Sequence, residues 1–354
     1  MERRKTRKIK VGSVEVGGNA PVSIQSMTKT DTKNVEATLK QIRDLEKEGC
    51  EIVRVAVSDS ACIKPFKKIV NGSSIPVVAD IHFDYRLAIK SAEAGADCLR
   101  INPGNISSIE NIKAVADCAK KNGVSIRVGV NSGSLEKDLL EKYSHPVAEA
   151  LVESALRNIK ILENAGFEDM KISIKSTSVP DTYKAYSLLA KRVDYPFHIG
   201  VTESGPLFSG TVKSAVGIGA LLLEGIGDTL RVSLSADPVQ EVRVAKAILQ
   251  SAGIRAFGPD IVSCPTCGRA EIDVQKLASE IEEFTCRIKE PITIAVMGCS
   301  VNGPGEAKEA DIGIAGGKNI GIIFKKGKII KKVPSEKLLS EFKKIIAGEI
   351  NALE

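Results

Sequence analysis

Three cysteines near the C-terminal end have the spacing of a metal-binding centre. Cys264 and Cys267 form a Cys-x-x-Cys turn, and Cys299 follows in a turn rich in glycine and proline, residues 297–306. A Cys-x-x-Cys turn presents two thiolates to one metal centre without strain, and the glycines beside Cys299 let the backbone approach a bulky inorganic core. The pattern therefore predicts that these three thiols bind one metal centre.

The fourth ligand of that centre decides which metal it holds. We expect Cys286, which follows a helical pattern, to be a small buried hydrophobic residue. Glu306 is the other candidate, because Gly303-Pro304-Gly305 lets the chain turn back towards the thiols. Three sulfurs and one oxygen suit a [4Fe–4S] cluster with one exchangeable iron, whereas structural zinc prefers a complete shell of sulfur or nitrogen ligands. Structural zinc and a redox dithiol remain alternatives at this point.

A second group of polar residues lies where short β-branched segments end. Four arginines and a lysine occur there with two acids, Asp80 and Glu203. Burying an unpaired charge is costly, and two acids cannot neutralise five cations. Arginine fits phosphate with two parallel hydrogen bonds. The pattern therefore favours a bound polyanion, a diphosphate in particular, over a set of structural ion pairs. The cations are Arg54, Arg100, Arg127, Lys175 and Arg231.

Neutral donors and proton carriers accompany these cations. Asn102, Asn131 and Ser233 could donate further hydrogen bonds to phosphate. His82 and His198 also fall at segment ends and are candidates for substrate contact. Glu203 is the best placed carboxylate to deliver a proton. Lys171 or Lys175 could instead be the Schiff-base lysine of an aldolase-type barrel.

The elements that position these residues repeat eight times. Each apolar segment is followed by a helical pattern, and many helices end at glycine. Eight strand–helix units predict a (β/α)8 TIM barrel over residues 1–258, preceded by a β-hairpin at 7–16, and then a small α+β domain over residues 259–354. The strands are expected at 22–27, 52–56, 77–80, 98–101, 126–129, 170–174, 198–201 and 229–232. The helices are expected at 35–48, 60–70, 85–94, 109–121, 147–165, 181–192, 211–223 and 238–252.

Composition limits the remaining possibilities. The 354 residues are 43% hydrophobic and contain eight cysteines, too few for a disulfide scaffold, and the basic N-terminus precedes no apolar segment. We expect a cytoplasmic, reduced protein with no membrane segment. The net charge of +6 is modest, tryptophan is absent and aromatic residues make up 4%, so nucleic-acid binding is not expected.

The motifs resemble those of the hydroxymethylbutenyl diphosphate synthase family, the iron–sulfur enzymes of the penultimate step of the methylerythritol phosphate route to isoprenoids. The likeness covers almost the whole chain. It rests on residues 264–269 and 296–307, and on the barrel motifs at 23–28, 78–83, 99–105 and 230–234. One departure is Lys175-Ser176-Thr177-Ser178, where a small residue and an acid are expected after the lysine.

The resemblance implies a [4Fe–4S] cluster held by Cys264, Cys267, Cys299 and Glu306. It implies that 2-C-methyl-D-erythritol 2,4-cyclodiphosphate is reduced by two electrons, opened and dehydroxylated, with ferredoxin or flavodoxin as the electron donor. Members are similar in forming head-to-tail homodimers, in which the cluster domain of one subunit covers the barrel of the other. The alternatives are an aldolase or pterin-type synthase with a structural zinc module, and a basic cluster protein that binds RNA.

Overall fold

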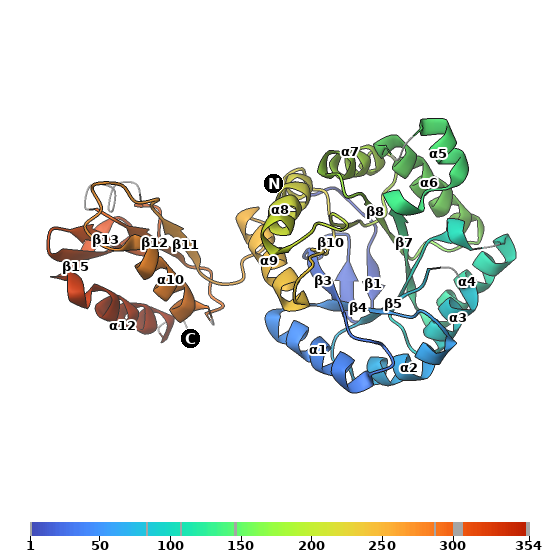
Figure 1. The fold of residues 1–354 in the computed structure, drawn as a ribbon, viewed down its shortest axis with the longest axis horizontal. Coiled ribbons are helices and arrows are strands. Elements are labelled where there is room, and N and C mark those ends of the chain that lie inside the picture. The colour runs from blue at the N-terminus through green and yellow to red at the C-terminus, as the bar shows by residue number, and fades with distance from the viewer. Residues whose placement is uncertain are drawn as a thin grey trace. The chain divides into compact units, whose positions relative to one another are not determined.

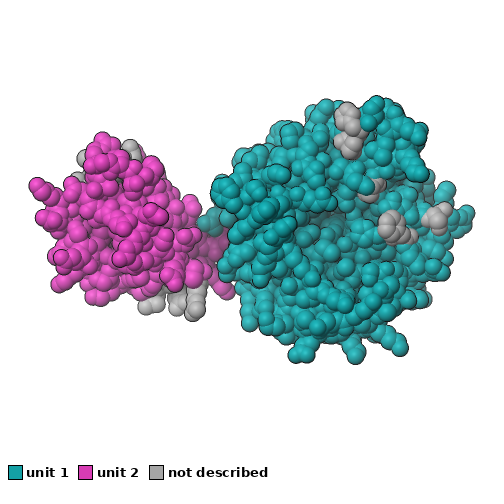
Figure 2. Space-filling model, viewed as in Figure 1, with its two compact units in different colours: residues 1–255 teal, residues 256–354 magenta. Residues whose placement is uncertain are grey.

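The structure, a computed structural model, divides into two compact units. It describes residues 2–82, 84–106, 108–144, 147–286, 288–299 and 307–351. Unit 1 spans residues 1–255 and unit 2 spans residues 256–354 (Figure 2). The sequence places the same division after residue 258. Each unit has its own sheet and core.

Unit 1 is a barrel of eight parallel strands (Figure 1). The strands are hydrogen-bonded in the order β8-β7-β6-β5-β4-β3-β10-β9, and a parallel bridge between Ile172 and Phe197 joins β8 to the segment before β9, which closes the ring. The predicted TIM barrel is therefore confirmed. Its strands are β3 (Ser23–Met27), β4 (Ile52–Ala56), β5 (Val77–Asp80), β6 (Cys98–Ile101), β7 (Ser125–Asn131), β8 (Met170–Lys175), β9 (His198–Ile199) and β10 (Thr229–Leu230).

Helices surround the barrel, and glycine ends many of them. Six glycines predicted as left-handed caps all have positive φ: Gly49, Gly95, Gly123, Gly166, Gly225 and Gly253. Within the described ranges, no helix is long and apolar enough to cross a membrane. The helices are α1 (Val35–Glu48), α2 (Ile63–Gly72), α3 (Tyr85–Glu93), α4 (Ile109–Asn122), α5 (Lys137–Tyr143), α6 (Ala148–Asn164), α7 (Val179–Ala190), α8 (Leu207–Leu223) and α9 (Pro238–Ser251).

The predicted hairpin covers the amino end of the barrel. Strands β1 (Ile9–Val11) and β2 (Val14–Val16) pair antiparallel around the Gly12-Ser13 turn. Their side chains form an apolar cluster with residues at the starts of the barrel strands, namely Ile52, Val78 and Cys98. Because this end of the barrel is filled, the carboxyl ends of the strands are left to form a site.

Unit 2 is built on a five-stranded sheet in the order β11-β12-β13-β14-β15. Helices α10 (Val274–Thr285) and α12 (Leu338–Asn351) contribute Ile281 and Phe342 to the core on one face. A smaller cluster that includes Met297 and Phe324 occupies the other face. The strands are β11 (Asp260–Ser263), β12 (Thr293–Met297), β13 (Ile312–Gly317), β14 (Ile320–Lys325) and β15 (Lys328–Pro334).

Two local predictions for unit 2 were incomplete or wrong. The sequence pattern predicts strands at 261–263 and 292–296, a hairpin around Lys326-Gly327 and helices at 274–284 and 336–347, but not strand β13, which lies in the middle of the sheet. Cys286 was expected to be buried, but it is exposed, because it is the C-cap residue of α10 and lies off the buried face that Val274, Ile281 and Thr285 form.

Candidate active site and metal centre

A cavity of about 480 Å³ lies at the carboxyl ends of the barrel strands. Five of the predicted site residues line it, namely His82, Arg100, Asn102, Asn131 and Glu203. The loops after β7, β8 and β9 complete the wall with Ser132, Thr177 and Thr202. These five predicted residues thus come from different strands to one polar cavity, whereas the other predicted residues of the barrel do not line it.

Asp80, at the end of β5, pairs with two of the arginines. Its carboxylate lies 3.3 Å from Arg100 Nη1, 3.7 Å from Arg54 Nε and 3.7 Å from His82 Nε2. Burial alone would raise the pKa of Asp80, but Arg54, the hydrogen bond with His82, and Arg100 together hold the pKa well below its usual range. Asp80 is therefore ionised and supplies one negative charge to two guanidinium groups.

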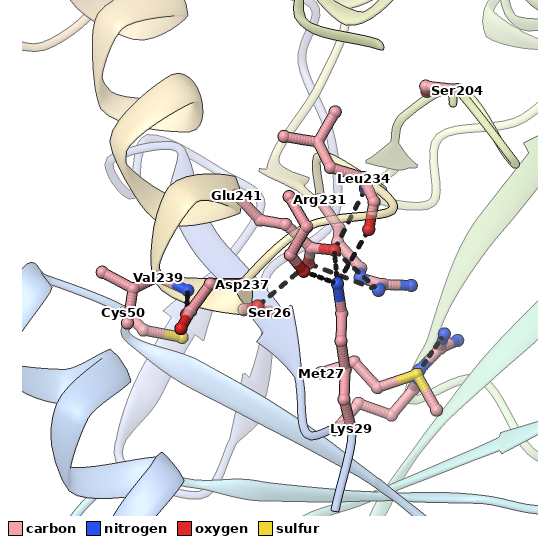
Figure 3. A network of polar contacts seen from close by, with 12 residues as sticks. Ser26, Met27, Lys29, Cys50, Ser204, Arg231, Leu234, Asp237, Val239 and Glu241 are labelled. Carbon is pink, nitrogen blue, oxygen red and sulfur yellow. Dashed lines mark hydrogen bonds and ion pairs between the residues drawn. The ribbon is translucent and has the colours of Figure 1, made fainter. Parts of the chain in front are cut away.

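Arg231, which directly follows β10, pairs with an acid that the sequence reasoning missed. Glu241 of α9 is fully buried and lies 3.3 Å from Arg231 Nη2 and 3.2 Å from Lys29 Nζ. It also accepts hydrogen bonds from the Ser26 hydroxyl and the Leu234 backbone amide (Figure 3). The sequence reasoning counted only Asp80 and Glu203 as acids near the cations, so it overlooked this third carboxylate. The available signal was helical spacing, which places Glu241 on the buried face of α9 with Val242, Ala245, Ile248 and Leu249.

A layer of unpartnered polar side chains lies deeper in the barrel. Arg127 was predicted at a strand end, but it is the third residue of the seven-residue strand β7 and is buried because its side chain points into the barrel core. Among the residues that the structure describes, its Nε and Nη1 atoms have no hydrogen-bond partner, and neither do Lys171 Nζ and the two ring nitrogens of His198. Burial lowers the pKa of Lys171 to about 8 and holds the pKa values of Arg127 and His198 well below their ordinary values.

Lys175, at the end of β8, adds a further buried cation. A Cβ atom on Gly200 would lie 2.8 Å from Lys175 Nζ, so the glycine makes room for the ammonium group. Burial, followed by the charges of Arg127 and Arg231, holds the pKa of Lys175 well below its ordinary value. Even if every lysine of the site is neutral, its four arginines exceed the two buried carboxylates, Asp80 and Glu241. The site therefore retains positive charge for an anionic ligand.

The remaining predicted residues lie at or near the rim of the barrel. Glu203 is exposed and has a φ of 50°, in the left-handed region, where it directs the β9–α8 loop past the cavity. Asn102 is buried, and its side-chain oxygen accepts from the Gly104 amide while its Nδ2 atom has no partner. Ser233 is half-buried in the loop after β10.

The three cysteines of unit 2 follow two neighbouring strands. Cys264 directly follows β11, and Cys299 lies two residues beyond β12; these strands pair parallel, with Ser263 opposite Val296. The Gly298 amide donates to Cys264 Sγ at 3.2 Å. Backbone and side-chain hydrogen bonds from Arg269 lower the pKa of exposed Cys267. Glu306 lies outside the described residues, as does His145.

The residues present fit an iron–sulfur cluster. Among the described side chains, no three ligating groups are already gathered around one metal position. The candidate ligands that follow the two neighbouring strands, Cys264, Cys267 and Cys299, are nevertheless all thiols. A backbone amide that donates to a cysteine sulfur, as Gly298 does to Cys264, is the kind of hydrogen bond that stabilises cluster thiolates. The backbone beside Cys299 is also closely packed, because a Cβ atom on Gly316 would lie 2.4 Å from the Gly298 carbonyl oxygen. Thiol chemistry and close backbone approach both suit a bulky inorganic core.

Solved structures similar to this chain share the barrel. Dihydropteroate synthase of Yersinia pestis aligns with a TM-score of 0.51 at 11% identity, covering 70% of this chain and 98% of that one. Type I 3-dehydroquinate dehydratase of Clostridium difficile aligns with a TM-score of 0.52 at 14% identity, covering 70% and 99%. At these identities the likeness shows the fold alone.

Family models and curated relatives cover nearly the whole chain. The GcpE TIM-barrel domain matches residues 6–246, and the GcpE protein C-terminal domain matches residues 260–348. Proteins named 4-hydroxy-3-methylbut-2-en-1-yl diphosphate synthase (flavodoxin) are 59% identical in Caldanaerobacter subterraneus, with 97% of each chain covered, and 56% identical in Clostridium perfringens, with 98% of this chain and 99% of that one covered. These relatives give the alternative of an aldolase or pterin-type synthase no support. The chain belongs to the GcpE family of 4-hydroxy-3-methylbut-2-en-1-yl diphosphate synthases.

Proposed function

We propose that this chain catalyses the reductive ring opening of 2-C-methyl-D-erythritol 2,4-cyclodiphosphate to (E)-4-hydroxy-3-methylbut-2-enyl diphosphate. Two electrons enter, one carbon–oxygen bond to the diphosphate breaks, and a hydroxyl group leaves as water after protonation. The observation that carries the proposal is the surplus of arginine over carboxylate in the barrel. Arg100 and Arg127 are buried and Arg54 and Arg231 are largely enclosed, against the two carboxylates of Asp80 and Glu241, and among the described residues Arg127 has no partner at Nε and Nη1. A doubly phosphorylated ring supplies the missing negative charge.

Binding of the diphosphate is assigned to the cations and amides of the barrel. Arg54, Arg100, Arg127, Lys175 and Arg231 provide the charge, and Asn102, Asn131 and Ser233 provide neutral donors. Asp80 pairs with Arg54 and Arg100, and Glu241 pairs with Arg231. These ion pairs orient the three guanidinium groups before substrate binds. Preorganised donors of this kind also stabilise the negative charge that develops on the departing phosphate oxygen.

The cofactor of the proposal is a [4Fe–4S] cluster held by Cys264, Cys267, Cys299 and Glu306. Such a cluster supplies low-potential electrons and a Lewis-acidic iron for the substrate oxygen. The relatives are named for flavodoxin, so the expected electron donor is flavodoxin or, as the sequence suggested, ferredoxin.

Proton delivery to the leaving hydroxyl is assigned to Glu203. It lines the cavity, is exposed to solvent protons, and is not held by the ion pairs that occupy Asp80 and Glu241. His82 and His198 are the alternatives. His82 also lines the cavity, whereas His198 is completely buried, and its depressed pKa keeps it neutral. Geometry therefore favours Glu203.

A cytoplasmic homodimer completes the proposal. All eight cysteines are free thiols, which suits a reducing compartment. The outer face of α8 exposes three large apolar side chains at helical spacing, Phe208 (84%), Val216 (57%) and Leu223 (56%), and exposed apolar groups that share one face mark interaction surfaces. We assign this face to a second copy. The head-to-tail arrangement remains part of the proposal.

The test is conversion of the cyclodiphosphate by the anaerobically prepared full chain with dithionite-reduced methyl viologen. Phosphorus NMR distinguishes the cyclic diphosphate from the linear product. We expect the linear diphosphate to accumulate in step with viologen oxidation, two electrons per product. Absence of product with iron-loaded protein would refute the proposed function.

A further inference from the structure

We propose that unit 2 carries a docking face for a small acidic electron-donor protein on strands β14 and β15. The β14–β15 face is defined by Lys318, Ile320, Ile329 and Lys332. The inference rests on the proposed function, because it assumes that electrons reach the cysteines of unit 2 from a flavodoxin-like partner. It goes further by assigning the surface that receives this partner.

Charge is unevenly distributed in unit 2. Residues 313–344 contain nine lysines and two glutamates, whereas residues 256–312 contain ten acids and five basic residues. These lysines lie on β14, β15, the turns beside them and the first half of α12, so this half of unit 2 is strongly basic. A patch of this kind attracts an acidic partner and speeds its association.

The lysines of the face are available to a partner. Lys318 and Lys332 are exposed and form no ion pair with a residue that the structure describes. Lys331 differs, because its ammonium group lies 2.6 Å from Glu341 of α12. Lys318 and Lys332 therefore keep their full charge for recognition.

Apolar side chains accompany these lysines, with Ile320 between the two and Ile329 beyond Lys332. Ile320 and Ile329 are each 46% exposed. In an antiparallel pair, residues opposite each other share a face of the sheet, and Ile322 is opposite Lys332 while Phe324 is opposite Ile329. Exposed isoleucine beside unpaired lysine gives the mixed composition of a transient interface.

The face lies near the cysteines. Ile322 and Phe324 belong to the cluster with Met297, and Cys264 packs against this cluster as well as against the cluster on the opposite face of the sheet. Met297 is opposite Ala315, so β13 ends beside the cysteines, and Lys318 follows that end directly. Two strand spacings, about 10 Å, separate β12 from β14, and three, about 14 Å, separate β12 from β15. A donor on this face would therefore lie close to the thiols, as electron transfer requires.

The same lysines and isoleucines could in principle serve two different roles. Lysines on an edge strand such as β15 often serve to prevent association between sheet edges. That role does not account for Lys318, which lies in a turn, and exposed isoleucines would promote such association instead of preventing it. A second copy could occupy the face through its acidic α10 side. The barrel of a second copy is a poor occupant, because it is itself cationic.

The experiment measures steady-state turnover with two reductants, a reduced bacterial flavodoxin and reduced methyl viologen. In the double variant K318E/K332E we expect the KM for flavodoxin to rise about tenfold or more at low ionic strength, with viologen-driven turnover within twofold of wild type. The neutral variant K318Q/K332Q should give an intermediate rise. High salt should raise the wild-type KM and reduce the difference between the proteins.

The matched control is K276E/K289E, which changes net charge equally through exposed lysines on or beside α10. Its flavodoxin KM should stay within twofold of wild type. An unchanged KM in both variants of the face, or an equal rise in the control, would overturn the docking face. So would a change of oligomeric state in K318E/K332E by sedimentation, which would assign the face to a second copy. If the wild-type protein turns over with neither reductant, the proposed function itself is refuted.

Discussion

Arg127 illustrates, at the scale of single residues, how the barrel interior departs from an ordinary core. TIM barrels are usually filled by branched apolar side chains, whereas here Arg127, Lys171 and His198 are buried without partners at the atoms named above. A guanidinium group cannot escape the cost of burial by losing its proton. An anionic ligand compensates this cost when it binds. Arg127 therefore lowers the stability of the ligand-free protein and increases the affinity for the ligand.

Replacing Arg127 by methionine separates these two effects. We expect the affinity for the cyclodiphosphate to fall by about 1.5 to 3 kcal/mol, the loss of a charge-assisted hydrogen bond, in calorimetric titration. In the ligand-free protein, the free energy of unfolding should rise by about 1 to 3 kcal/mol, because an unpaired polar group is no longer buried. The exposed Arg43→Met variant should change neither quantity. Unchanged substrate affinity would show that Arg127 has a purely structural role.

Glu203→Gln tests the proton donor. Because the amide keeps the shape but cannot deliver a proton, turnover should fall about 100-fold or more, while iron content and substrate affinity stay near wild type. Viologen oxidation in the presence of the cyclodiphosphate is the readout. Near-normal turnover would remove Glu203 from the mechanism and leave His82 as the candidate at the cavity.

Lys171 predicts a pH dependence of stability. Its folded-state pKa of about 8 lies below its ordinary value, so between about pH 8 and 10.5 the unfolded chain binds a proton that the folded chain does not. The free energy of unfolding contributed by this group therefore rises with pH across that window, by about 3 kcal/mol in total. Denaturant unfolding of wild type and Lys171→Met should show their difference shrinking as pH rises. A difference that is constant from pH 7.5 to 10 would contradict this assignment.

At the scale of elements, local patterns predicted most of the framework. The strands at 52–56, 77–80 and 98–101 have the predicted bounds, because short β-branched segments between helices carry a strong local signal. β9 and β10 are shorter than predicted, at two residues each. β13 was missed because its sequence, Ile-Gly-Ile-Ala-Gly-Gly, has low strand propensity, and its pairing with β12 and β14 is a tertiary effect.

The partner of Arg231 shows what local patterns could not predict. Sequence reasoning found the cation at the end of β10, but its acid comes from the buried face of α9, and the same acid also holds Ser26 and Lys29 from β3 and the loop after it. Ser26 and Lys29 lie more than 200 residues before Glu241 in the sequence. Only the closed barrel, in which β3 neighbours β10, brings them together with Arg231 and Glu241. Helix α9 therefore fixes part of the site as well as covering β3.

Glu241→Gln tests this role of α9. Removing the charge leaves Arg231 and Lys29 without their shared carboxylate, and breaking a buried ion pair costs about 3 to 5 kcal/mol of stability. We expect a loss of that size in denaturant unfolding, together with a higher KM for the cyclodiphosphate through misplacement of Arg231. Glu283→Gln, an exposed change on α10, is the control and should be neutral. A loss below about 1 kcal/mol would mean that Arg231 is oriented by other groups.

At the scale of the whole molecule, the two units contribute different chemistry. The cations that the sequence identified lie in unit 1, and the three thiols lie in unit 2. Counting charges predicted a polyanion site, and cysteine spacing predicted the three thiol ligands with Glu306 as a candidate for the fourth. The identity of the diphosphate and the choice of cluster over zinc came from the resemblance to a known family. Glu306 and the turn around it lie outside the described residues, so the fourth ligand stays a prediction.

The most direct test of the central claim is the iron and acid-labile sulfide content of the full chain purified without oxygen. We predict a brown protein with about four irons and four sulfides per chain. The Cys299→Ser variant should lose most of both while its barrel still binds the cyclodiphosphate. A colourless wild-type protein, or one whose only metal is zinc, would contradict the proposed function.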